Sequence, residues 1–141
     1  MWGDFVMRLA LNTRLARLLS VSVVCGMAAI GVVRAAGVAE GDAKAGSTVF
    51  EASCGNCHTV KEGKHKSGPS LFGVVGRQAA TEKNFEYSDA LKAANLTWTP
   101  ETLNTFITNP KGLVEKTKMK FAGMPNETNR ANLLAFLAEQ K

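Results

Sequence analysis

The residues best suited to cofactor or redox chemistry lie within five positions, Cys54-Gly55-Asn56-Cys57-His58. The recognised pattern C-x-x-C-H indicates covalent haem attachment, in which each thiol adds across one vinyl group of the porphyrin. The next residue, His58, then binds the iron as its fifth ligand. A short turn of helix would hold both sulfur atoms beneath the same edge of the ring.

Two other kinds of site also use cysteines at this spacing. A thioredoxin-like redox pair follows a strand in a βαβ unit, and the residues before Cys54 show no convincing strand pattern. A zinc site needs four ligands, and the only further histidine, His65, lies seven residues beyond His58 between two lysines. The motif therefore predicts one haem c, bound covalently through Cys54 and Cys57.

Iron bound by His58 on one face can be left open on the other face or can bind a second side chain. A methionine sulfur at that position raises the reduction potential and suits electron transfer. After residue 39 the sequence has two methionines, Met119 and Met124. Both lie outside the apolar stripe of a helix, which weakens core packing as an explanation, and spacing alone does not choose between them.

The elements expected to position these residues are helices joined by long loops. Apolar residues at helical spacing predict a helix over residues 40–51, ending close to the cysteines, and another over residues 127–140. Residues 59–80 and 111–125 have the composition of loops. In the C-terminal helix, four apolar side chains are expected to be buried: Leu133, Leu134, Phe136 and Leu137.

Two shorter helices are expected between these ends. Ser88 followed by Asp89 predicts the capped start of one, and Thr99-Pro100-Glu101 predicts the start of the other. Asn109-Pro110 predicts the end of the second helix. The fold class is therefore all-α.

The first 39 residues differ in composition from the rest of the chain. Three arginines precede an uncharged run of 16 residues, 18–33, and small residues follow it. A signal-peptide core has roughly 7–15 apolar residues and a membrane-spanning helix about 20. We expect residues 1–39 to be a signal peptide cleaved between Ala35 and Ala39, with an uncleaved N-terminal anchor as the alternative. Either outcome places the remainder in the periplasm.

Residues 40–141 form a second segment of 102 residues, which is enough for one domain with a small core. The formal net charge of +5 falls to about +2 here, because four arginines and one aspartate lie before residue 40. Nothing in this charge requires a nucleic-acid partner. A bound haem would supply much of the apolar core.

Beyond the haem motif, an ordered set of segments carries a family resemblance: residues 64–71, 76–77 and 85–90, Trp98, and residues 109–110, 117–123 and 133–137. With the motif, they resemble class I cytochromes c, in particular the mitochondrial-like branch that includes bacterial cytochromes c2. The resemblance implies the class I cytochrome c fold. In that fold the N- and C-terminal helices cross, and short helices and loops wrap around one covalently bound haem.

The resemblance also implies ligand roles. Met119, in Thr117-Lys118-Met119, matches the axial methionine, and Met124 remains a minor rival. Pro69 matches the proline whose carbonyl accepts a hydrogen bond from the ring of His58, as partners of metal ligands commonly do.

Further roles follow in the same way. In the family, three residues hydrogen-bond a buried haem propionate, and their positions match Arg77, Tyr87 and Trp98. The hydroxyls of Ser88 and Thr117 are expected to add further donors. The resemblance also implies that Gly46 and Phe50, in the N-terminal helix, contact Phe136 in the C-terminal helix.

Two positions depart from the family pattern. Phe106 stands where a tyrosine is common near the axial sulfur, and Leu91 stands where an asparagine often joins the same polar network. Both changes remove hydrogen-bond donors. We expect a drier haem pocket with an altered potential and an unchanged function.

The implied function is a soluble, monomeric one-electron carrier of the periplasm and not an enzyme, because both faces of the iron would be occupied. The implied partners are a cytochrome bc1-type complex and a terminal oxidase or reaction centre. A peroxidase-like haem protein is the rival, and it would need an open sixth position. Six lysines are expected around the exposed haem edge, where they would steer docking onto acidic partners: Lys61, Lys64, Lys66, Lys116, Lys118 and Lys120.

Overall fold

Five helices are present within residues 40–141, the part of the chain that the computed structural model describes: α1 (Ala43–Ser53), α2 (Asp89–Ala93), α3 (Pro100–Thr108), α4 (Pro110–Leu113) and α5 (Glu127–Glu139). The only strand-like pairing among these residues is an isolated antiparallel bridge between Gln78 and Thr97. The all-α prediction is confirmed. The predicted signal peptide or anchor, residues 1–39, lies outside the described residues.

Each longer helix begins at a side chain that accepts hydrogen bonds from the first turn. Asp42 accepts from the backbone nitrogens of Lys44 and Ala45 at the start of α1. Ser88 and Thr99 cap α2 and α3 in the same way, and Asn126 caps α5. Such caps satisfy N–H groups that have no partner inside the helix. The helix starts predicted from Ser88 and Thr99 are confirmed.

The short helix α4 was not expected in the loop predicted over residues 111–125. Asn109 ends α3, as predicted, but its side chain also accepts a hydrogen bond from the backbone N–H of Gly112 at 3.0 Å. Pro110 then occupies the first turn of α4, where its missing N–H is not needed. One Asn-Pro pair thus ends one helix and starts the next.

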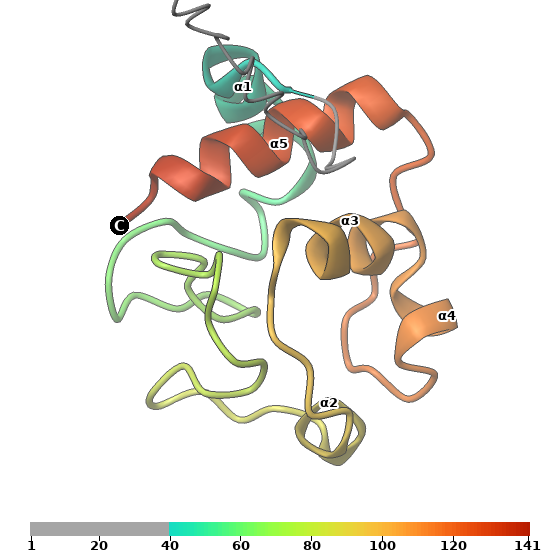
Figure 1. Ribbon diagram of the computed structural model, residues 1–141. Coiled ribbons are helices and arrows are strands. Elements are labelled where there is room, and N and C mark those ends of the chain that lie inside the picture. The colour runs from blue at the N-terminus through green and yellow to red at the C-terminus, as the bar shows by residue number, and fades with distance from the viewer. Residues whose placement is uncertain (1–39) are drawn as a thin grey trace, which may run out of the picture. The chain divides into compact units, whose positions relative to one another are not determined.

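The terminal helices α1 and α5 cross at close range (Figure 1). Gly46 makes the approach possible, because a Cβ atom at this position would lie 2.0 Å from the backbone oxygen of Asn132. The Phe50 and Phe136 rings pack beside it with centroids 5.4 Å apart. Phe136 is only partly covered, whereas the other three apolar residues expected to be buried in α5 are buried.

Helix α3 lies next to this crossing and connects it to the methionine-bearing loop. Arg130 of α5 donates from Nε to the side-chain oxygen of Asn104 in α3 at 2.8 Å. Its Nη1 donates to the carbonyl oxygens of Met124 and Pro125, at 2.9 and 2.8 Å. The end of the loop that carries Met119 is therefore fixed to both helices.

The long connection from α1 to α2 is held by hydrogen bonds rather than by regular structure. The ring of His65 accepts from the backbone N–H of Ser70 through Nδ1, at 3.1 Å, and donates from Nε2 to the carbonyl of Lys83, at 2.8 Å. His65 is thus a structural loop histidine.

No helix within residues 40–141 is long and apolar enough to cross a membrane.

Candidate haem-binding site

A cavity of about 720 Å³ lies among α3, the loops before α2 and the loop that follows α4. Its volume is in the range of cofactor and ligand sites. All nine residues predicted for the site line it: Cys54, Cys57, His58, Pro69, Arg77, Tyr87, Trp98, Thr117 and Met119. These residues are up to 65 positions apart in the sequence, and the fold brings them together around one cavity.

Both cysteines lie just beyond the last residue of α1, and both are free thiols. The backbone N–H groups of Cys57 and His58 donate to the carbonyl of Cys54 at 3.0 and 2.9 Å, which closes a tight turn and carries the side chains to one edge of the cavity. Burial, with a smaller contribution from Cys57, raises the pKa of Cys54 to about 11. A raised pKa favours the protonated form of this thiol at neutral pH.

The ring of His58 is oriented by its neighbours. Its Nδ1 donates to the carbonyl oxygen of Pro69 at 2.7 Å, which leaves Nε2 as the ring nitrogen available to a metal. Burial lowers the pKa of His58, and the hydrogen bond to Pro69 opposes this in part. The ring packs on Gly68, where a Cβ atom would lie 2.4 Å from Cε1.

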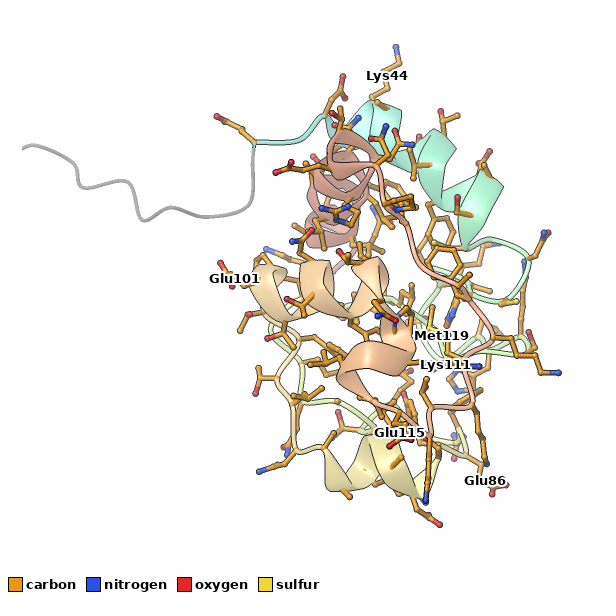
Figure 2. All side chains as sticks on the ribbon, turned by 90° about the vertical axis from the view of Figure 1, so that its right-hand side faces the viewer. Lys44, Glu86, Glu101, Lys111, Glu115 and Met119 are labelled. Atoms are coloured by element: carbon orange, nitrogen blue, oxygen red, sulfur yellow. The ribbon has the colours of Figure 1, made fainter. Side chains whose placement is uncertain are left out.

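The two methionines have different surroundings. Met119 lines the cavity, and its backbone N–H donates to the hydroxyl of Thr117 at 3.3 Å. Met124 is not among the lining residues; it is buried in the core, with its N–H donating to Ile107 at 2.8 Å. Met119, labelled in Figure 2, is partly buried and lies on the loop that follows α4.

A polar group forms one part of the cavity wall. Arg77 donates through Nη1 to the carbonyl of Phe72 at 2.8 Å and to Glu82 at 2.5 Å, and through Nη2 to the carbonyl of Ser70 at 3.1 Å. Burial raises the pKa of Tyr87, while the nearby Arg77 charge acts against the rise. The acidic partner of Arg77 was missed in the sequence, although Glu82 is the only acidic residue between positions 63 and 85.

The rest of the wall is apolar. Trp98 and Phe106 pack against each other with ring centroids 5.0 Å apart, and both are buried. Leu91 is also buried in the lining. Both departures from the family pattern, Phe106 and Leu91, therefore line the cavity, and the drier pocket stays a prediction.

The donor set fits a covalently attached haem. Two free thiols, an imidazole with its tautomer set by a carbonyl, and a thioether share one apolar cavity with a polar edge. A zinc site is not supported, because residues 40–141 place no group of three or more His, Cys, Asp or Glu side chains around a common point. The strand that a thioredoxin-like pair would follow is also missing from these residues.

The six lysines expected around the haem edge are all exposed. Lys118 and Lys120 line the cavity. Lys61 and Lys66 line a smaller hollow of about 420 Å³ that shares His58 with it. Lys118 lies 3.5 Å from Glu86, but both side chains are largely exposed, so this pair contributes little to stability.

Comparison with known proteins agrees with this geometry. The family model Cytochrome c matches residues 43–141. A cytochrome c-type cyt cy of Rhodobacter capsulatus is 46% identical over 97 residues, which cover 69% of this chain and 48% of that protein. The cytochromes c of Cannabis sativa and Tetrahymena pyriformis are 43% and 45% identical over 100 residues, covering 70% and 71% of this chain and 90% of each relative. The chain belongs to the cytochrome c family, as a class I, bacterial c2-like member that binds haem c through Cys54 and Cys57 and carries electrons.

Proposed function

We propose that this protein is a one-electron carrier in which His58 and Met119 bind the two faces of the haem iron. The observation that carries the proposal is that both side chains line the cavity that the two cysteines also line, while Met124 is buried elsewhere. The haem supplies the one-electron chemistry of its iron. When the haem is bound, His58 and Met119 would both hold its iron, which would leave no position on the metal for a substrate.

The other lining residues have positioning roles in this proposal. Pro69 fixes the ring of His58 through its carbonyl. Arg77, Tyr87 and Trp98 provide the donors that a buried propionate requires. Thr117 holds the backbone next to Met119, and the apolar wall excludes water.

We place the carrier in the periplasm, exported by residues 1–39, and attached to a membrane only if that segment is retained. Its partners are a cytochrome bc1-type complex as donor and a terminal oxidase or reaction centre as acceptor, and it acts as a monomer in a respiratory or photosynthetic chain. The export assignment rests on the signal-like composition of the N-terminal segment, and the partner assignments rest on the resemblance to bacterial cytochromes c2.

A redox titration of the holoprotein, combined with ligand binding, tests the proposed function. We expect a reversible one-electron transition, and no binding of carbon monoxide to the reduced protein at neutral pH, because a thioether occupies the sixth position. The reduced protein should be oxidised by an oxidase and regenerated by a bc1-type complex. Rapid carbon monoxide binding together with turnover of hydrogen peroxide would instead support the peroxidase-like rival.

The lysines expected at the haem edge lead to a prediction about docking. Replacing Lys64, Lys66, Lys118 and Lys120 together with glutamine should slow electron exchange with the membrane complexes roughly tenfold at low salt, mainly through the association rate. The haem spectrum should not change, because these exposed side chains lie outside the iron ligands. Stopped-flow rates measured against ionic strength check this, since the screening length is only about 8 Å at 0.15 M.

The matched control removes four exposed lysines outside the set expected at the haem edge: Lys44, Lys83, Lys92 and Lys141. This variant has the same net charge as the test variant and should keep rates close to those of the wild type. Equal slowing in both variants would mean that net charge, not a docking face, controls association.

A further inference from the structure

Glu82 forms an ion pair with Arg77 that is mostly shielded from water. Glu82 Oε2 lies 2.5 Å from Arg77 Nη1, and the two side chains are only 15% and 19% exposed. The other hydrogen bonds of the guanidinium go to backbone carbonyls of Ser70 and Phe72. Glu82 is therefore the one charged partner of Arg77 within residues 40–141.

Arg77 of this pair lines the haem cavity, and Glu82 contacts this arginine from outside the lining. Tyr87 lines the same cavity. The segment between the two charged residues is fixed at both ends. Ala79 N–H donates to the carbonyl of Leu96 at 2.8 Å, and the carbonyl of Lys83 accepts from His65 at 2.8 Å. The carboxylate is thus held in place by the loop and is not a mobile surface group.

We propose that Glu82 sets the reduction potential of the haem by neutralising Arg77 at the edge of the cavity. The inference rests on the proposed function, in which Arg77 faces a haem propionate. Without Glu82 the guanidinium would be balanced only by that propionate. With Glu82 present, two carboxylates share one cation, and the net charge beside the haem is one unit more negative.

The direction of the effect follows from charge. Accepting one electron lowers the net charge of the haem iron by one unit. A fixed negative charge nearby favours the more positive, oxidised state, and it does so more strongly where water is excluded. Glu82 therefore lowers the potential, and Arg77, which carries the opposite charge, raises it.

The experiment compares the midpoint potentials of holoprotein variants by titration with redox mediators. At a fixed ambient potential, Glu82→Gln should raise the reduced-to-oxidised ratio by about threefold or more. Arg77→Gln should shift this ratio in the opposite direction, and E82Q/R77Q should return towards the wild type. Glu82→Asp keeps the charge and should keep a potential near that of the wild type.

The matched control is Glu86→Gln. Glu86 lines the same cavity, but its side chain is 88% exposed, so removal of its charge should be screened by water and change the ratio less than E82Q does. Equal shifts in E82Q and E86Q would overturn the proposal. A shift of E82Q and R77Q in the same direction would also overturn it, because that result indicates loosening of the pocket rather than an effect of charge.

The thermal unfolding of each variant is measured alongside the potential, so that destabilisation is separated from the charge effect. If E82Q accumulates without haem, E82D carries the test: a potential far from the wild-type value despite the retained charge would overturn the proposal. A holoprotein with no reversible one-electron transition would contradict the proposed function itself, and this outcome is visible in the wild type alone.

Discussion

Replacing Cys54 or Cys57 with alanine should reduce the yield of holoprotein severely, by roughly tenfold or more. Each variant retains one thiol and can form only one thioether bond. The domain should then fold poorly, because the cavity of about 720 Å³ among its apolar residues would lack the haem. Domains of about 100 residues bury too little surface to tolerate such a loss. The pyridine haemochrome spectrum and the mass of the purified protein report the attached haem directly.

The third cysteine provides the matched control. Cys25 lies in the uncharged run of the N-terminal segment, and Cys25→Ala should leave the haem content unchanged. The double variant C54A/C57A should contain no covalent haem and should be digested rapidly by protease. A stable, protease-resistant apoprotein with a Cys54–Cys57 disulfide would contradict this prediction and would favour a redox pair.

The sequence predicted those parts of the fold that depend on local interactions. Caps at Ser88 and Thr99 involve hydrogen bonds over three residues, so the capping residue and the helix it starts are visible together in the sequence. The apolar stripe predicted a helix over residues 127–140, and α5 ends one residue earlier, at Glu139. The missed helix α4 shows the limit, because Asn109-Pro110 fits a helix end and a helix start equally well.

The haem site was partly predictable for a different reason. Cys54, Cys57 and His58 are contiguous and carry their own chemical pattern, whereas Arg77, Tyr87 and Trp98 were named only through a family resemblance. The pairing of Arg77 with Glu82 depends on the path of a loop held by distant hydrogen bonds. Neither helical periodicity nor capping patterns contain that information, so only the structure places this carboxylate beside the cavity.

The choice between Met119 and Met124 leads to the second large effect. Met119→Ala should leave the haem covalently attached but lower the midpoint potential by more than about 0.1 V, because loss of a thioether ligand removes the stabilisation it gives to the reduced iron. The oxidised wild type should show the weak far-red absorption band of a methionine–iron bond, and the variant should lack it. The open position should also bind added imidazole or carbon monoxide.

Met124→Ala is the matched comparison, because it removes the same side chain from the core rather than from the cavity. Met124 is only 6% exposed, so its truncation should lower the free energy of unfolding by about 2–5 kcal/mol. Its far-red band and potential should stay close to those of the wild type, since the backbone of Met124 remains held by Ile107 and Arg130. If the band instead survives in Met119→Ala and disappears in Met124→Ala, Met124 is the ligand, and the loop must rearrange when haem is attached so that the buried methionine reaches the cavity.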